Sequence, residues 1–331
     1  MPAPVRRGGD TDFNSGAAAE TGTRREHVYQ AITRRMIEAL ETDTVPWQKP
    51  WRSEAGRPLR MNNGQGYRGI NVLLLSLTAQ ERGYQSRWWG TVKQINELGG
   101  HVRKGQTRQN GAGSTTVIWF KMLKREQRNP ETGEPETASF PIARAYSVFN
   151  ADQCDDLPDR FYPDPGEVQV LPEPQAVLEA YLANGGPRLR HVHGNRAYYQ
   201  AEPDLITLPQ QSQFRSAEHY YATAGHECVH STGHPSRLKR EGIEKFDHFG
   251  SERYSKEELV AEMGAAILAA ETGIDRDDLF TNSTAYIASW LRVLKDDRSL
   301  VISAAAKAQR AVDLILGAVT PAEVDGERAD S

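Results

Sequence analysis

The pattern His-Glu-x-x-His in the stretch ATAGHECVHSTGHP (residues 222–235) constrains this chain more than any other feature. Residues i and i+4 lie on the same face of a helix, so His226 and His230 can bind one metal ion together. Glu227 directly follows His226 and can accept a proton from a water molecule on that ion. The spacing therefore predicts a helical zinc (Zn2+) site with Glu227 as general base. The alternative is a helix whose three polar residues bind nothing.

A zinc site of this kind needs a third protein ligand, and the residues just after the pattern supply one weak candidate. His234 follows His230 by four residues, but Gly233 is expected to end the helix before it. The extended pattern HExxHxxGxxH fails because Ser236 stands where the third histidine is required. The third ligand is therefore expected elsewhere in the chain.

The segment SKEELVAEMGAAILAAE (255–271) offers two carboxylates at helical spacing, Glu258 and Glu262. It resembles the third-ligand helix of glutamate-type zincins, in which the first acid binds zinc and the second supports a ligand histidine. We assign Glu258 as ligand and Glu262 as its support. The reverse stays open, because Ser255 and Glu258 also form an S-x-x-E capping box, which would leave Glu262 as the ligand. Cys228 is expected to be a small buried residue that points away from the histidines.

The ligand count predicts the chemistry. Three protein ligands leave one coordination position for water, whose pKa zinc lowers to about 7. Glu227 would take the proton and pass it to a leaving amine, so the predicted reaction is amide hydrolysis. Residues 196–200 are expected to form a strand along which a substrate peptide adds as a further strand. Tyr198 and Tyr199 would face opposite sides of that strand.

The formal net charge of -4 hides two halves of opposite sign. Residues 24–150 contain 20 Lys and Arg against 11 Asp and Glu, which gives +9, and residues 151–331 contain 18 against 30, which gives -12. Five of the six tryptophans also fall in the basic half. The two halves are therefore expected to meet different partners.

Cations alternate with aromatic rings in the basic half, as in PWQKPW, SRWWGTVKQ and WFKMLKR. Single-stranded nucleic acid favours this combination, because cations follow the phosphates and rings stack on unpaired bases. The alternative is that tryptophans are core residues, and we expect two or three of the five to be structural, including one of Trp88 and Trp89. The candidate DNA contacts are Trp47, Trp51, Arg60, Asn62, Tyr67, Arg68, Asn71, Trp88, Trp89, Lys93, Arg103, Lys104 and Lys121.

The length of 331 residues suffices for two domains, each able to bury its own core. The hydrophobic pattern predicts that the chain is α+β. The first domain, residues 24–150, is expected to hold three helices followed by a hairpin with a long turn-rich loop at 127–137. A proline-rich linker at 151–174 precedes a mostly helical second domain at 175–317 with a small sheet. The predicted helices cover residues 24–42, 69–82, 92–98, 175–183, 216–232, 255–272, 283–294 and 300–316.

The two ends of the chain and its cysteines indicate in which cellular compartment the protein is expected. Residues 1–23 and 318–331 are expected to be loose tails, and the first of these has no apolar block typical of a secretory signal. No apolar run reaches 18 residues, so no membrane partner is expected. Cys154 and Cys228 lie far apart in the sequence and do not indicate a disulfide framework. We expect the protein in the cytoplasm.

Motifs along residues 24–317 resemble the ArdC-type antirestriction proteins of conjugative plasmids, whose first part also heads TraC-type primases. The first half contributes VPWQKPW, YRGINVLLL, RWWGTVKQINELGGHVRKGQ and AYSVFNADQ to the resemblance. The second half contributes NRAYYQAEPDLITLP, GHECVHSTGHPSRLKR, YSKEELVAEMGAAIL and AYIASWLRVLKDD.

The resemblance implies an N-terminal domain that binds single-stranded DNA, a C-terminal zincin-like metallopeptidase domain, and protection of incoming plasmid DNA from restriction. Two other functions stay open. The chain could be a zinc protease recruited to DNA, with restriction enzymes or other DNA-bound proteins as peptide substrates. It could instead be a non-enzymatic protein that coats DNA and uses zinc only to hold its second domain together.

Overall fold

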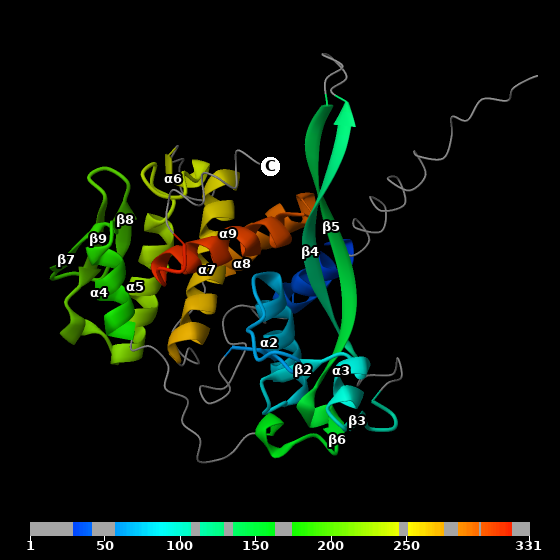
Figure 1. Cartoon of the computed structure of the whole chain (residues 1–331). Helices are drawn as coiled ribbons and strands as arrows, with labels where there is room; N and C mark the ends of the chain where they lie inside the picture. Colours follow the sequence, from blue (N-terminus) through cyan, green and yellow to red (C-terminus); the bar gives the residue numbers. More distant parts are fainter. Residues whose placement is uncertain are drawn as a thin grey trace, which may run out of the picture.

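The computed structural model of the chain describes residues 29–41, 57–106, 113–128, 135–162, 174–244, 251–274, 284–297 and 299–319. Within the hairpin strands, the described side chains end at Trp119 and resume at Arg144. In these ranges, no helix combines the length and the apolar character that crossing a membrane requires. The architecture is mixed α+β, as predicted: a sheet dominates the first half, and helices around a small sheet make up the second (Figure 1).

The first half begins with helical residues 29–41 and continues through short strands and helices to a long hairpin. Its helices end or begin at the expected signals. The helix Ile70–Arg82 (α2) is followed by Gly83 at φ +68°, and the helix Val92–Glu97 (α3) starts with a capping box between Thr91 and Gln94. The strands and short helices of this half are β1 (Leu59–Arg60), β2 (Trp88–Gly90), β3 (His101–Val102), β4 (Thr115–Arg128), β5 (Pro135–Asn150), η1 (Ala151–Gln153), β6 (Cys154–Asp155) and η2 (Asp159–Phe161).

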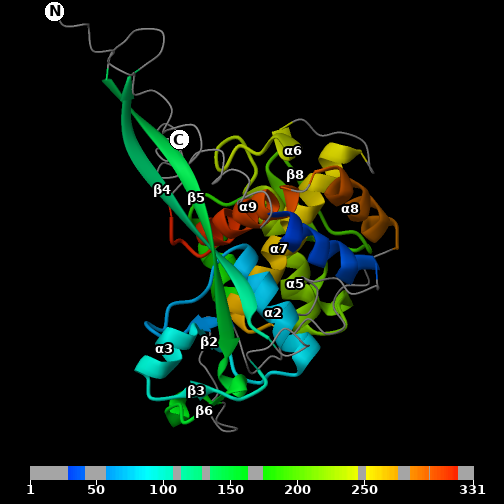
Figure 2. The same ribbon diagram turned by 90° about the vertical axis from the view of Figure 1, so that its right-hand side faces the viewer.

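The strands β1, β2, β5 and β4 form one sheet in that order, and β3 pairs with β6 in a second. Strands β4 and β5 pair antiparallel from Thr115 opposite Val148 to Arg128 opposite Pro135. Their outer part projects beyond the helices as an arm in both views (Figures 1 and 2). The hairpin was predicted, but the loop expected at 127–137 was too long. Because the two strands pair with each other, residues 127–128 and 135–137 are extended although the local sequence favours a turn.

Residues 151–162 pack against the first half, which corrects the linker predicted at 151–174. Their apolar side chains belong to a buried cluster made of Met61, Ile95, Phe149, Ala151, Cys154, Leu157 and Phe161. The prolines and acids of this stretch suggested a linker, but its apolar residues recur every three or four positions and fill one core. Residues 163–173, the rest of the predicted linker, lie outside the described part of the chain.

The second half holds a three-stranded sheet and the remaining helices. The strand order is β7-β9-β8, with β9 parallel to β7 and antiparallel to β8. Its elements are α4 (Pro174–Ala183), β7 (Arg188–Val192), β8 (Tyr198–Gln200), β9 (Leu205–Pro209), η3 (Gln211–Gln213), α5 (Ala217–Ser231), α6 (Glu241–Glu244), α7 (Glu252–Thr272), α8 (Thr284–Asp296) and α9 (Leu300–Ile315). The helices α4, α5, α7, α8 and α9 begin and end within about three residues of the predicted positions, whereas α6 and η3 were not predicted.

The two halves share part of one hydrophobic core. Ile32, Met36 and Leu40 from the first helical segment lie in the same buried cluster as side chains of α7 and α9, and Figure 2 shows this segment beside α8 and α9. Polar contacts join the halves too: Arg57 pairs with Glu271, Arg68 pairs with Asp313, and the Gly69 amide donates to Gln309 at 2.8 Å. Part of the core is thus shared, and the first half also has buried clusters of its own, one around Phe161 and one around Trp89.

Candidate metal centre and nucleic-acid interface

Helix α5 presents His226 and His230 on one face. The helix starts at its N-cap Ser216, whose hydroxyl accepts from the His219 amide, and ends at Ser231. His234 lies beyond this end, where its Nδ1 is 2.7 Å from the Ser236 hydroxyl, and it does not join the two histidines. Cys228 is buried and unpaired by any disulfide, as predicted, and burial raises the pKa of its thiol.

Helix α7 begins at Glu252, with Ser251 as N-cap accepting from the Tyr254 amide. The sequence left open a start at Ser255, in which Glu258 would close a capping box. That alternative is wrong, because Ser255 already lies inside the first turns and its hydroxyl donates to the Ser251 carbonyl at 2.9 Å. Glu258 is therefore free of a capping role and projects from the second turn of the helix.

Small residues let α5 and α7 approach closely. A Cβ atom on Gly264 would lie 2.7 Å from a methyl carbon of Val229, and one on Gly225 would lie 3.2 Å from a methyl carbon of Leu268. Real side chains at these positions would push the helices apart. The two glycines thus hold the acidic face of α7 within reach of the imidazoles on α5.

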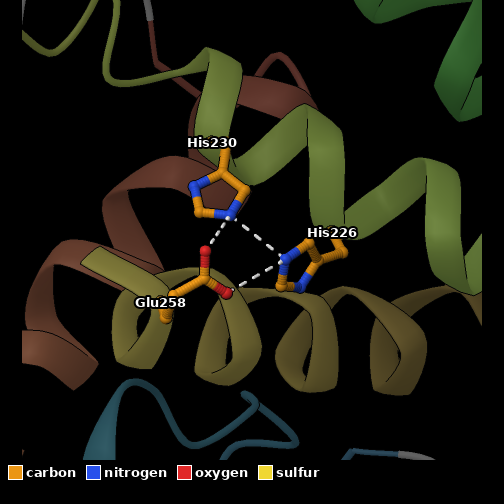
Figure 3. A group of neighbouring side chains, drawn as sticks. All are labelled: His226, His230 and Glu258. Carbon is orange, nitrogen blue, oxygen red and sulfur yellow. Dashed lines mark hydrogen bonds and ion pairs between the residues drawn. The ribbon is translucent and has the colours of Figure 1, made fainter. Parts of the chain in front are cut away.

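Three donor atoms converge between these helices (Figure 3). The Nε2 atoms of His226 and His230 are 3.1 Å apart. Oε2 of Glu258 lies 3.7 Å from Nε2 of His226, and Oε1 of Glu258 lies 3.4 Å from Nε2 of His230. Burial alone would raise the pKa of Glu258, but the charges of the two imidazoles outweigh it and lower it to about 2. Within the described residues, this is the one group of three or more His, Cys, Asp or Glu side chains close enough to share an ion.

The spacing of the three side chains fits one tetrahedral metal ion. Zinc binds nitrogen and oxygen at about 2.0 to 2.2 Å, so the edges of its tetrahedron measure about 3.2 to 3.6 Å. The 3.1 Å between the two Nε2 atoms is close to those edges, and each Nε2 atom lies 3.4 or 3.7 Å from one oxygen of the Glu258 carboxylate. One ligand atom from each of the three side chains lies within 4.8 Å of the others. Two imidazoles and one carboxylate are also the donor set that such sites use. The residues present therefore fit the metal that the motif implies.

Each imidazole has a second carboxylate behind it. Glu262 lies 3.4 Å from Nδ1 of His226, as its predicted supporting role requires. Glu257 lies 3.4 Å from Nδ1 of His230, and its role was missed in the sequence. A carboxylate in this position fixes the imidazole tautomer, so that Nε2 points its lone pair at the ion. Both ligand histidines are thus oriented from α7.

Arg240 holds Glu257 in place from the loop after α5. Its guanidinium contacts both carboxylate oxygens of Glu257, at 2.6 Å for the shortest contact, and donates to the Thr232 hydroxyl and the Val229 carbonyl. Arg240 and Glu257 are each exposed by only 7%. Burial raises the pKa of Glu257, but the Arg240 charge outweighs it and the net shift is downward. The pair is therefore a buried, hydrogen-bonded ion pair.

Replacing Arg240 with methionine should lower the unfolding free energy of the metal-free protein by about 3 to 5 kcal/mol, because it leaves the Glu257 carboxylate buried without a partner. Urea denaturation measures this. The double variant Arg240→Met with Glu257→Gln should recover part of the loss. Lys256→Met is the matched control, since its ion pair with Glu252 is exposed and should contribute less than about 1 kcal/mol. Equal losses in Arg240→Met and Lys256→Met would contradict the role given to the buried pair.

Glu227 lies beside the three ligands and is 6% exposed. Burial raises the pKa of its carboxyl to about 7, helped by the nearby charge of Glu258 and opposed by that of His230. The backbone amide of Tyr199 in β8 also hydrogen-bonds to this carboxylate. Strand amides lie in the plane of the sheet, so the side of β8 away from β9 faces Glu227.

The predicted DNA contacts divide into core residues and surface residues. Trp89 is 1% exposed and Tyr67 is 6% exposed, so Trp89 is the inward-facing ring of its pair. Burial raises the pKa of Tyr67 to about 12. The amide of Asn71 makes two 2.7 Å hydrogen bonds to the backbone of Ile118. All three side chains are buried and so cannot contact DNA at the surface. Their assignment as DNA contacts is therefore corrected.

Other candidates lie at the surface. Lys93, Lys104 and Asn62 are exposed. Arg68 and Arg103 are exposed too, but each pairs with an acid, Arg68 with Asp313 and Arg103 with Asp155 at 2.8 Å. Three further candidates are outside the described residues or side chains: Trp47, Trp51 and Lys121.

Arg60 and Trp88 are half-buried surface candidates. The Arg60 guanidinium lies 5.4 Å from the centre of the Tyr67 ring. Trp88 packs edge-on against Phe161 with ring centres 5.2 Å apart. Most of the surface cations thus fall in two groups, one around α3 and β3 and one around β1.

Each half of the chain matches a known protein family. Residues 26–149 match the N-terminal domain of the anti-restriction factor ArdC, and residues 176–307 match a zincin-like metallopeptidase. Crystal structures of the antirestriction protein ArdC from plasmid R388, one metal-free and one with Mn(II) bound, are 42% identical to the chain with a TM-score of 0.69. Each covers 87% of this chain, which in turn covers 96% and 97% of them.

Curated relatives extend the similarity. A DNA primase TraC from Escherichia coli is 36% identical over 305 residues, which are 87% of this chain but 27% of the primase. The chain therefore spans about a quarter of that relative. The uncharacterized protein y4eC from Sinorhizobium fredii is 33% identical over 86% of this chain and 90% of its own length. With matches to both domains and to the whole length of ArdC, the chain belongs to the ArdC family of antirestriction proteins.

Proposed function

We propose that this protein binds single-stranded DNA, protects incoming plasmid DNA from restriction, and uses its second domain as a zinc metallopeptidase on proteins bound to that DNA. The observation that carries the peptidase part is the group of His226, His230 and Glu258 beside the buried Glu227. Structural zinc sites usually close all four positions with Cys or His. In the described part of the chain, three donors converge here, which favours a site that also admits water.

The chemistry divides between the metal and the chain. When bound by His226, His230 and Glu258, zinc supplies a Lewis acid that makes water acidic enough to lose a proton near neutral pH. Glu227 accepts that proton and delivers it to the leaving amine. Its buried position favours this exchange, because burial brings its pKa to about 7, so the carboxyl can both take and give a proton. Glu262 and Glu257 keep the ligand imidazoles oriented.

Strand β8 supplies a place for the substrate peptide. Among the described strands it pairs only with β9, and its other edge faces Glu227. An extended peptide could add to that edge by main-chain hydrogen bonds, as predicted for residues 196–200. The two tyrosines differ in orientation: the Tyr199 hydroxyl donates to Asp204 at 2.8 Å, and the Tyr198 hydroxyl contacts Thr207 and Arg190.

The basic first half supplies the proposed DNA contact, and salt dependence tests it. Replacing Lys93, Arg103 and Lys104 with alanine should reduce the slope of log affinity against log salt for a single-stranded oligonucleotide by about 0.7 for each phosphate that the variant no longer neutralises. Fluorescence anisotropy measures this slope. Lys307→Ala, an exposed lysine on α9, is the matched control. An unchanged slope in the triple variant would show that these three residues do not contact the phosphates of the DNA.

A further inference from the structure

The arm formed by β4 and β5 carries two exposed aromatic rings that the predicted DNA contacts did not include. Trp119 is 42% exposed and Tyr146 is 41% exposed, and only Val92 joins them among the large hydrophobic side chains that the structure describes as exposed. The strands place Trp119 opposite Arg144 and Val117 opposite Tyr146. Residues directly opposite share a face, as do residues two apart on one strand. Trp119, Tyr146 and Arg144 therefore lie on one face of the arm.

The exposure of this face changes abruptly along the strand. Val117 is 6% exposed and packs in a buried cluster with Trp89, Val72 and Leu75. Trp119, two residues further out on the same face, is 42% exposed. The row of apolar side chains thus continues past the point where the rest of the protein covers it. Beyond the helices, β4 and β5 project together (Figures 1 and 2). Large rings in this position are costly to expose to water unless a partner covers them.

We infer that this face of the arm binds single-stranded DNA, with bases stacked on Trp119 and Tyr146 and a phosphate at Arg144. The inference rests on the proposed function and adds the surface that carries it. Charge favours this partner, because β4 and β5 contain five Lys and Arg against two Glu, and Arg144 is exposed beside the rings. Single-stranded DNA matches both the positive charge and the exposed rings, because its phosphates are acidic and its bases are flat and apolar.

The geometry favours a single strand over a duplex. Trp119 and Tyr146 are diagonal neighbours across the strand pair, a relation that separates side chains by about 7 to 8 Å. Bases along one strand of a duplex are about 3.4 Å apart and stacked on each other. Two rings at roughly twice that spacing suit a strand whose bases are splayed and stack on protein instead. Duplex DNA keeps its bases paired and offers no such faces.

Anisotropy with a labelled oligothymidylate tests the inference. Trp119→Ala and Tyr146→Ala should each weaken binding by about 5- to 100-fold, because each variant removes the ring on which one base stacks. The salt slope should stay unchanged in these variants and should fall by about 0.7 in Arg144→Ala. Trp119→Phe should retain most of the affinity. Thr116→Ala and Ser147→Ala are matched controls, since these exposed residues face each other on the opposite side of the arm.

Photocrosslinking gives a second readout that does not depend on affinity. An oligothymidylate that carries one 5-iododeoxyuridine should crosslink to Trp119 or Tyr146, as mapped by mass spectrometry. If the wild-type protein binds the oligonucleotide while both ring variants bind equally well, the inference is overturned and the proposed function stands. Equal losses in the Thr116→Ala and Ser147→Ala controls would overturn it too. If the wild-type protein binds no single strand at low salt, the proposed function falls together with the inference.

Discussion

Glu227→Gln should abolish proteolysis while leaving the metal in place. Glutamine keeps the shape of the side chain but cannot accept a proton, and general base catalysis contributes about 10²- to 10⁴-fold to such reactions. Glu227 is outside the group of three donors, so metal content should not change. The measurement is cleavage of a purified restriction endonuclease, followed by gel electrophoresis, with zinc-loaded protein and single-stranded DNA present.

The same variant separates the two parts of the proposed function. Plasmid transfer into restricting and non-restricting recipients measures protection. If Glu227→Gln loses cleavage and loses protection, proteolysis is the protective activity. If it loses cleavage and protects fully, DNA binding alone protects and the peptidase has another task. Cleavage at the wild-type rate would show that Glu227 is not the general base.

The second large effect is expected for metal affinity, where Glu258 and Glu262 should differ. Glu258→Gln removes a ligand and should weaken zinc binding by more than about 100-fold. Glu262→Gln keeps all three ligands and loses only the carboxylate behind His226, a change that typically costs 10- to 100-fold. Competition with a chromogenic chelator measures both constants, and Glu257→Gln should behave like Glu262→Gln, because it supports His230 in the same way.

A reversed order would reassign the site. If Glu262→Gln lost the metal while Glu258→Gln kept it, Glu262 would be the third ligand, the alternative that the sequence left open. Lys256→Gln serves as the control on the same helix, because its side chain pairs with Glu252 at the surface and not with the histidines. This control should bind zinc like the wild-type protein.

The helical part of the metal site could be predicted because it depends on local spacing. His226 with His230, and Glu258 with Glu262, are each one helical turn apart, and a turn brings such pairs together whatever surrounds them. The partnership between the two helices was harder to predict. To predict it, the ExxxE segment had to be assigned as the source of the third ligand. The S-x-x-E pattern offered a competing role for Glu258 as a capping residue, which the structure excludes because the N-cap of the helix lies four residues earlier, at Ser251.

Contacts made by loops could not be predicted in the same way. Arg240 reaches Glu257 because the chain turns back after α5, and nothing in the spacing of residues 231–240 fixes that path. Glu257 offered a weak signal, since it lies next to the proposed ligand Glu258. The choice between Trp88 and Trp89 had the same difficulty: alternation on a strand shows that one ring faces inward, but only the packing of α2 shows which.

The arm shows a third kind of limit. Its strands include residues 127–128 and 135–137, the two ends of a segment that locally predicts a loop, and the pairing of β4 with β5 is a tertiary effect. Trp119 is exposed because it lies beyond the part of β4 that packs against other side chains, and the sequence does not show where that part ends. Composition and spacing do not distinguish among the five tryptophans of the basic half, whereas the structure separates the buried Trp89 from the exposed Trp119.

X-ray absorption at the zinc edge of the loaded wild-type protein tests the central claim most directly. The account predicts two imidazole nitrogens and only oxygen besides, at about 2.0 to 2.2 Å, with the same spectrum in Glu227→Gln. A sulfur ligand at about 2.3 Å, or a third imidazole, would show that another side chain completes the site. Either result would contradict a hydrolytic centre made of His226, His230 and Glu258.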